Sequence, residues 1–293
     1  MADPVRALTR LFRWGSTPPV GRSARGTFYG AETEVALRFR TLLDDQAPMV
    51  ATTDGEALRA ALLPAVKTFI AEERGAIEAA HRAGASGLEV VARHADLVDA
   101  MICQLFGLAD RGMARSLKEQ TEGCAVLALG GYGRRELNPA SDVDVMFLHP
   151  RRLDHYIRAI LDHVLYFLWD LGFTVGHSCR SLTDAVRMMD ADLTSRTSML
   201  EARFLAGSEQ VFADFQDRMW KTLQGRRSQQ YVQLKLQEQA QRHARYGGSV
   251  YLQEPNVKEG PGGLRDFHTA LWVARARHRL DDLKALPALG LLT

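Results

Sequence analysis

The chain has 293 residues, enough for one large or two small domains. Hydrophobic residues make up 46% and charged residues 25%, as in ordinary soluble globular proteins, and the formal net charge is +2. This balance argues against a general nucleic-acid binder and against a membrane-surface protein, so any basic site must be local.

Cysteine usage and hydropathy indicate the compartment. The three cysteines share no metal-ligand spacing and form no even framework, which favours buried thiols in a reducing environment. The most apolar stretch, residues 157–171, is interrupted by Asp162, His163 and Asp170 and is too short and too charged to span a bilayer. Because no signal peptide is visible either, we expect a cytoplasmic protein with no membrane partner.

Two different sequence patterns follow one another in the first part of the chain. Residues 1–55 carry turn and coil signals at 15–19 and 21–23, which predict a weakly structured leader with one short helix. In residues 56–118, apolar side chains recur at helical spacing, and Gly84–Gly87 marks a break between two helices. We expect this N-terminal helical region to pack on the next domain and to carry no chemistry.

Residues 119–200 have the pattern of a mixed α/β domain. Short apolar runs at 124–129, 141–148 and 173–179 predict strands, and an amphipathic helix is expected at 155–171. Further helices are expected at 190–206, 208–223, 229–246 and 264–280. Residues 201–293 thus form a second helical region, interrupted by a polar loop at Glu254–Gly263. The fold class that we predict is α+β: a small mixed sheet with helices, flanked by helical regions.

A glycine-rich turn follows the first buried strand. Gly130, Gly131 and Gly133 let the backbone approach a ligand closely and adopt positive φ. A short helix starting here would point free N–H groups at an anion such as a triphosphate. A plain tight turn is the alternative, and the glycines by themselves favour that simpler interpretation.

Two acidic residues begin the second strand. Asp142 and Asp144 are two positions apart, so their carboxylates emerge on one face, whereas Val143, Val145 and Phe147 point into the core. Neighbouring carboxylates repel each other, and a hard divalent cation such as Mg²⁺ relieves that repulsion. A solvated strand edge explains the two aspartates equally well, but it leaves the glycine turn before them unexplained.

These motifs resemble a known family. The glycine turn followed by Ser141, Asp142 and Asp144 is similar to the signature of the polymerase-β nucleotidyltransferase superfamily. More narrowly, residues 130–137 (GGYGRREL) resemble the bifunctional PII uridylyltransferase/uridylyl-removing enzymes, which modify the PII nitrogen-regulatory protein. Three further segments resemble that family in the same order: 175–180 (VGHSCR), 200–207 (LEARFLAG) and 254–266 (EPNVKEGPGGLRD). The resemblance as a whole extends over roughly residues 60 to 280.

The resemblance implies a polymerase-β-like fold and specific roles. Gly130 and Gly131 would cradle the triphosphate with help from Ser141, and Asp142 and Asp144 would hold Mg²⁺. The third strand lacks the additional carboxylate of the wider superfamily. The general base is therefore open between His177 and the distant acids Asp184, Asp192 and Asp266. Histidine is a residue type suited to acid–base catalysis, but His177 is equally well interpreted as structural.

Basic residues elsewhere are weighed separately. Lys258 and Arg265 flank a glycine-rich entry into a predicted helix and could neutralise phosphate charge; a rigid inter-helix turn with solvated charges is the alternative. One of Arg134 and Arg135 could reach phosphate, and Tyr132 is expected to pack or to stack on a base. The basic run 275–279 is interpreted as a solvated helix face, so we expect no nucleic-acid partner.

The implied function is transfer of UMP from UTP to a tyrosine of a PII-type protein, with Mg²⁺ as cofactor and pyrophosphate released. The alternatives are a nucleotidyltransferase with another nucleoside triphosphate or acceptor, and a non-catalytic nucleotide-binding module. The family's nucleotide-removing domain is of the His-Asp type, and this chain contains no His-Asp dipeptide. We therefore expect this chain alone neither to remove the nucleotide nor to sense glutamine.

Overall fold

The computed structural model describes residues 20–22, 27–31, 33–46, 55–112, 121, 123–246, 254–280, 287 and 290. They fall into two compact units, each described by itself. The sheet unit comprises Thr17–Arg187 and Glu201–Gln216; the helical unit comprises Met1–Ser16, Met188–Leu200 and Asp217–Thr293. Within the described residues, no helix has the length and apolar character needed to cross a membrane.

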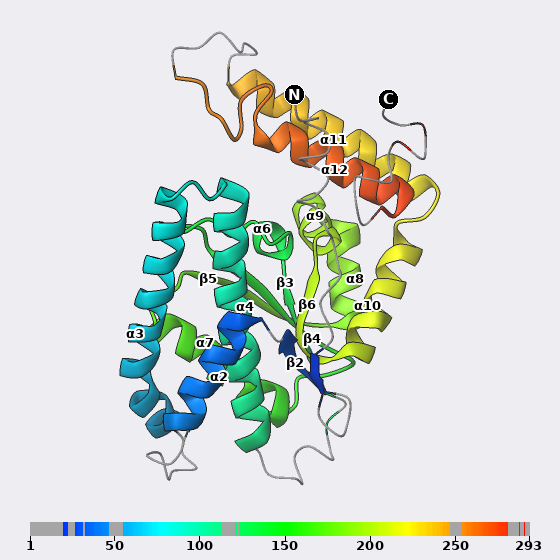
Figure 1. Cartoon of the computed structure of the whole chain (residues 1–293). Helices are drawn as coiled ribbons and strands as arrows, with labels where there is room; N and C mark the ends of the chain where they lie inside the picture. The colour runs from blue at the N-terminus through cyan, green and yellow to red at the C-terminus, as the bar shows by residue number, and fades with distance from the viewer. Residues whose placement is uncertain are drawn as a thin grey trace. The chain divides into compact units, whose positions relative to one another are not determined.

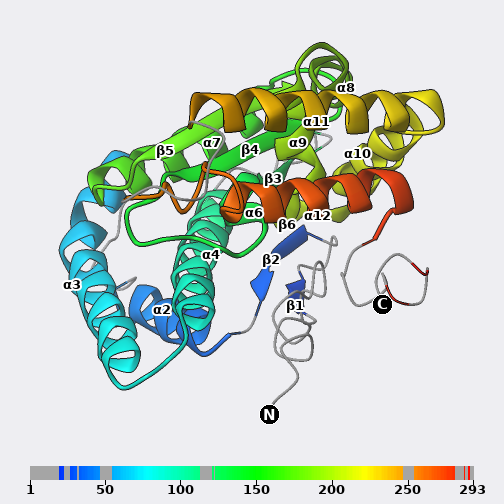
Figure 2. The same ribbon diagram turned by 90° about the horizontal axis from the view of Figure 1, so that it is seen from above.

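A mixed six-stranded sheet organises the sheet unit (Figure 1), and its strand order is β1-β2-β6-β3-β4-β5 (Figure 2). Only β4 and β5 run parallel; the other neighbouring pairs are antiparallel. This confirms the predicted α+β class and the expected mixed sheet. The strands are β1 (Val20–Arg22), β2 (Thr27–Ala31), β3 (Ala125–Ala128), β4 (Val143–His149), β5 (Val175–Ser181) and β6 (Arg203–Ser208).

The core of the sheet unit lies between the sheet and a helical layer. Its helices are α2 (Glu34–Gln46), α3 (Gly55–Arg82), α4 (Gly87–Gly112) and α7 (His155–Asp170). Val143, Val145 and Phe147 of β4 are at most 1% exposed and join the cluster formed by these helices, as their alternation predicts. The side chain of Asp154 accepts a hydrogen bond from the N–H of Ile157 and so caps α7.

Two segments differ from the sequence-based expectation. The helix expected at 190–206 ends early: α9 spans Leu193–Leu200, and the chain then enters β6. Pairing of β6 with β3 overrides local helix propensity there. The described part of residues 1–55 is also more structured than the expected leader, because it contains β1, β2 and the 13-residue helix α2 with buried Phe39 and Leu43. Residues 15–19 lie outside the described residues.

The helical unit is built around α11 (Arg226–Arg245) and α12 (Leu264–His278), which lie side by side (Figures 1 and 2). Both helices occupy the positions that the sequence predicts. The boundary between the units passes through α8 (Leu182–Ala191) and α10 (Glu209–Thr222). Of the basic run at 275–279, Arg275 is buried, so that segment is only partly the solvated face expected of it.

Candidate active site

The glycine turn is a tight bend between β3 and β4. Its four-residue helix α6 (Gly130–Gly133) begins directly after β3, and Gly130 has a φ of 55°. This left-handed conformation is accessible to glycine at little cost and disfavours other residues. The N–H of Leu129, just before the turn, donates to the carbonyl of Asp144, which ties the turn to β4. The turn and the acidic strand are therefore held together by the backbone.

The Asp144 carboxylate lies between two glycine backbones. A Cβ added to Gly130 would be 3.5 Å from Asp144 Oδ2, so that oxygen lies next to the turn. On the other side, Gly176 of β5 pairs with Asp144, and a Cβ added there would overlap Asp144 Oδ1. The absence of side chains at Gly130 and Gly176 makes room for this carboxylate.

The two acids are electrostatically coupled. Asp142 and Asp144 are both exposed overall, although the Asp144 carboxyl is partly covered. Burial raises the pKa of Asp144, and the negative charge of Asp142 raises it further. Oxygen-only donors carrying uncompensated negative charge fit a hard cation such as Mg²⁺. Among the described residues there is no group of three or more His, Cys, Asp or Glu side chains able to hold a metal ion.

The remaining predicted binding residues lie in different places. Ser141 is exposed, and its N–H donates to the carbonyl of Asn138 in the loop leading to β4. Lys258 and Arg265 belong to the helical unit. Lys258 is exposed, whereas the Arg265 guanidinium lies 5.3 Å from the ring centroid of Trp272 and 3.4 Å from Glu259. Arg265 is thus already engaged within its own unit.

His177 lies on the opposite face of the sheet from Asp144. It pairs with Val145, whose side chain points into the core, and its ring makes an edge contact with Trp169 of α7 at 5.5 Å. Because side chains alternate along strands, the β5 residues on the Asp144 face are Gly176, Ser178 and Arg180. This placement disfavours His177 as the general base.

The distant acids considered as bases have structural partners. Asp184 accepts from the Ser181 hydroxyl at 2.7 Å, and its own N–H donates to that hydroxyl. Asp192 accepts from the N–H of Ser195 at 2.6 Å at the start of α9, and this lowers its pKa. Each carboxylate therefore fixes a helix start, which is a sufficient reason for its presence.

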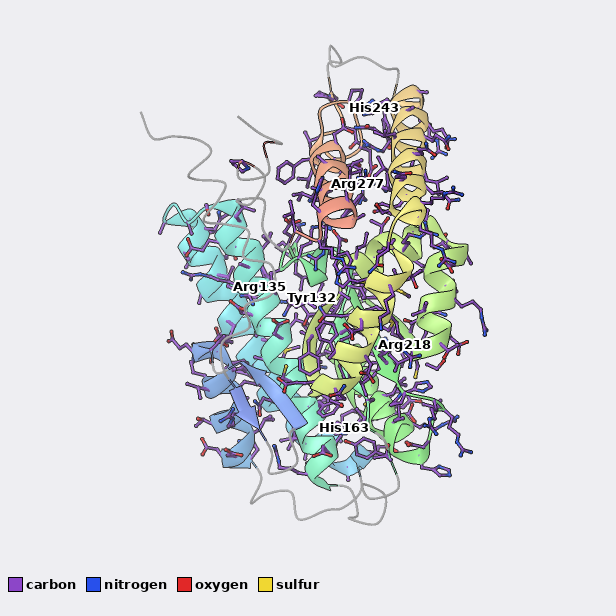
Figure 3. All side chains as sticks on the ribbon, turned by 90° about the vertical axis from the view of Figure 1, so that its right-hand side faces the viewer. Tyr132, Arg135, His163, Arg218, His243 and Arg277 are labelled. Atoms are coloured by element: carbon purple, nitrogen blue, oxygen red, sulfur yellow. The ribbon has the colours of Figure 1, made fainter. Side chains whose placement is uncertain are left out.

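The two arginines after the turn pair with acids. Arg134 donates to Glu136 and to the buried Glu201, and Arg135 pairs with Asp96 of α4. Tyr132 is 1% exposed (Figure 3 labels Tyr132 and Arg135). The expectation that one arginine is free for phosphate is therefore not supported, and Tyr132 takes the packing role rather than base stacking.

The polar loop of the helical unit is rigidly organised around Asp266. Its carboxylate accepts from Gly262 N–H at 2.7 Å, from Arg242 at 2.6 Å and from Gln239 at 2.8 Å, and it lies 2.9 Å from His243. Burial alone would raise the pKa of Asp266, but these hydrogen bonds outweigh burial and lower it. The geometry supports the rigid-turn interpretation of this loop.

We expect Asp266→Asn to destabilise the protein by about 2 kcal/mol at pH 7, because it weakens charge-assisted hydrogen bonds. A depressed carboxyl pKa stabilises the fold above the unfolded-state value of 3.8, and this contribution is lost as the pH falls through the folded-state pKa. Urea unfolding at pH 7, 5 and 3 measures the effect. The difference in free energy of unfolding between variant and wild type should be smaller at pH 3. The exposed Asp217→Asn should show no difference from wild type at any of the three pH values. Equal gaps at all three pH values would contradict the assignment.

Sequence reasoning assigned no role to three residues around the turn. Gly176 makes room for Asp144, Arg203 donates to a carbonyl of the turn, and Asp99 pairs with Arg203. The signal for Gly176 was present, since a glycine inside a predicted strand indicates a close approach of neighbouring atoms. No local pattern marks the pairing of Asp99 with Arg203, because these residues are 104 positions apart.

Comparison with known proteins places these features in context. A family model described as GlnD PII-uridylyltransferase matches residues 230–293, and one described as Glutamate-ammonia ligase adenylyltransferase matches residues 35–164.

Curated relatives include proteins named bifunctional uridylyltransferase/uridylyl-removing enzyme. The one from Erythrobacter litoralis is 41% identical over 248 residues, covering 83% of this chain and 27% of the relative. Those from Novosphingobium aromaticivorans and Rhodospirillum rubrum are 39% and 37% identical, covering 87% and 86% of this chain and 28% and 27% of each relative. The chain thus spans about a quarter of the length of these relatives.

Proposed function

Because the chain belongs to the family of bifunctional uridylyltransferase/uridylyl-removing enzymes, we propose that it catalyses the transferase half of their chemistry. In this proposal, a tyrosine hydroxyl of a PII-type protein attacks the α-phosphorus of UTP. A new phosphodiester bond forms, the bond to the β-phosphate breaks, and pyrophosphate leaves while the hydroxyl proton is lost.

The observation that carries this proposal is the position of Asp144. Its carboxylate lies against the backbone of Gly130, next to Asp142 and beside the space left by Gly176. Asp142 and Asp144 would hold Mg²⁺, and the N–H groups at the start of the turn would donate hydrogen bonds to phosphate oxygens. When bound, the cation would neutralise charge on the phosphates during in-line displacement. Ser141, in the same unit as the two acids, would add a polar contact to the nucleotide.

The free thiols support the cytoplasm as the compartment that we propose for this reaction. Cys103, Cys124 and Cys179 are all free, and the first two are buried. Burial raises the pKa of both buried thiols, which keeps them unreactive. Free thiols suit a reducing interior, so we place the reaction in the cytoplasm.

Incubation of the chain with α-³²P-labelled UTP, Mg²⁺ and a PII protein tests the proposal. We expect label on the PII protein only when Mg²⁺ is present, and none when its acceptor tyrosine is replaced by phenylalanine. If saturating UTP binds but no label reaches PII, the chain is a nucleotide-binding module rather than a transferase. If no nucleoside triphosphate binds at all, the site itself is wrongly assigned.

A second candidate, AMP transfer from ATP, is favoured by one observation. The adenylyltransferase family model covers residues 35–164, the part of the chain that contains the glycine turn and both acids. These features contact phosphates and metal, which are identical in UTP and ATP, so they do not select the base. Competition of unlabelled UTP, ATP, CTP and GTP against labelled UTP separates the two candidates. ATP competing more strongly than UTP would favour adenylyl transfer.

A further inference from the structure

The guanidinium group of Arg203 forms hydrogen bonds to the end of the glycine turn. Arg203, the first residue of β6, donates from Nε to the carbonyl of Gly133 at 3.2 Å and from Nη2 to the carbonyl of Tyr132 at 3.1 Å. The same guanidinium makes a two-point contact with Asp99 of α4, at 2.7 Å and 3.0 Å. Its carbon also lies 5.4 Å from the centroid of the Tyr132 ring. One side chain therefore connects β6, α4 and the end of the turn.

The hydrogen bonds from Arg203 complete the hydrogen bonding of the turn's carbonyl groups. The carbonyls of Leu129, Gly130 and Gly131 accept from N–H groups further along the turn. The Tyr132 carbonyl accepts both from the N–H of Arg135 and from Arg203, and the Gly133 carbonyl accepts from Arg203. Carbonyl oxygens from 129 to 133 are therefore engaged inside the sheet unit.

Arg203 has little capacity left for a phosphate. Its side chain is 11% exposed and that of Asp99 is 18% exposed. Although burial would lower the pKa of Arg203, the Asp99 charge raises it, so the Arg203 guanidinium carries its charge at neutral pH. Arg135 approaches Asp99 at 3.8 Å and also pairs with Asp96, which fixes the acid from a second direction. A Cβ added to Gly133 would overlap the carbonyl oxygen of Glu201, so the Glu201 backbone lies close to the end of the turn.

We propose that Arg203 and Asp99 are positioning residues that hold the glycine turn in the conformation that binds the triphosphate. This inference rests on the proposed function, and it assigns no substrate contact to either residue. Arg203 orients the turn through the Tyr132 and Gly133 carbonyls, and Asp99 orients Arg203.

Removing the negative charge of Asp99 distinguishes a positioning role from a purely electrostatic one. Asp99→Asn removes a negative charge from the unit that would bind an anion, so a purely electrostatic role predicts tighter binding of the nucleotide. A positioning role predicts weaker binding, because Arg203 loses its two-point ionic partner and the turn is freed. We expect Asp99→Asn to lower kcat/KM for the nucleotide about 10-fold and Arg203→Gln about 100-fold, as misplaced substrate-holding groups do.

The experiment measures Mg-UTP affinity, the kcat and KM of transfer, thermal unfolding, and hydrogen exchange of the peptide covering residues 129–137. Variants are Asp99→Asn, Arg203→Gln, Arg203→Lys and the double variant Asp99→Asn with Arg203→Gln. Arg93→Gln is the matched control, because it breaks the exposed Arg93–Glu89 pair on α4, the helix that carries Asp99. Arg203→Lys keeps the charge but loses the fork that reaches two carbonyls, so it should recover only part of the loss.

We expect faster hydrogen exchange at residues 129–137 and weaker UTP binding in Asp99→Asn, and we expect the double variant to lose no more activity than Arg203→Gln alone. If Arg203→Gln fails to fold, Asp99→Asn and Arg203→Lys carry the comparison. Tighter UTP binding by Asp99→Asn, or unchanged exchange and kinetics in both, would overturn the proposal while leaving the proposed function intact. Failure of the wild type to bind or transfer UTP would instead refute the proposed function.

Discussion

Asp144→Asn is expected to lower the rate of nucleotide transfer by about 10³-fold, an effect typical of losing a charged group that stabilises phosphoryl transfer. An asparagine keeps the size of the side chain and one oxygen, but it loses the charge that would hold the cation beside Gly130. Single-turnover transfer of labelled UMP at saturating UTP measures the loss. A rate within a few-fold of wild type would refute the role of this carboxylate.

Stability distinguishes this loss from misfolding. Burial and Asp142 raise the pKa of Asp144, so its ionised form costs stability above the folded-state pKa. The cost vanishes below the unfolded-state value of 3.8, where both states are protonated. Without Mg²⁺, Asp144→Asn should therefore melt at or above the wild-type temperature at pH 7. Glu89→Gln, an exposed acid of α4 paired with Arg93, is the matched control and should retain full activity.

The predictable part of the site is the part encoded by neighbouring residues. A continuous apolar run, glycines and an alternating acidic strand lie within residues 124–148, and β3, α6 and β4 follow that order. The hydrophobic period of residues 155–171 predicted α7 for the same reason. In each case, the side chains that determine the element are close in sequence, so pattern and structure agree.

The unpredicted part depends on which segments meet in space. Residues 203–208 have a composition compatible with helix and become a strand because β3 offers a partner edge. His177 lies on the core side of β5 because the parallel register pairs it with Val145, and no local signal fixes that register. Arg134 and Arg135 look available in sequence, but their acidic partners Glu201 and Asp96 lie far away along the chain.

Gly176→Ala is expected to reduce transfer about 100-fold although it adds only one methyl group. In β5, the new Cβ would overlap Asp144 Oδ1, and the carboxylate would have to rotate away from Gly130. Misplacement of a catalytic group by about 1 Å costs a similar factor. The backbone of Gly176 does not have a positive φ, so alanine introduces no backbone strain of its own. Transfer kinetics with a titration of Mg²⁺ should show a higher metal requirement.

The double variant Gly176→Ala with Asp144→Asn tests whether the methyl group acts through Asp144. If it does, the double variant should be no slower than Asp144→Asn alone, because the group that the methyl displaces has already lost its function. Gly75→Ala is the matched control, since a Cβ added to Gly75 of α3 meets nothing within 4 Å. That variant should keep full activity and gain up to about 1 kcal/mol of stability from helix propensity. Multiplicative losses in the double variant would show that Gly176 acts on something other than the carboxylate beside it.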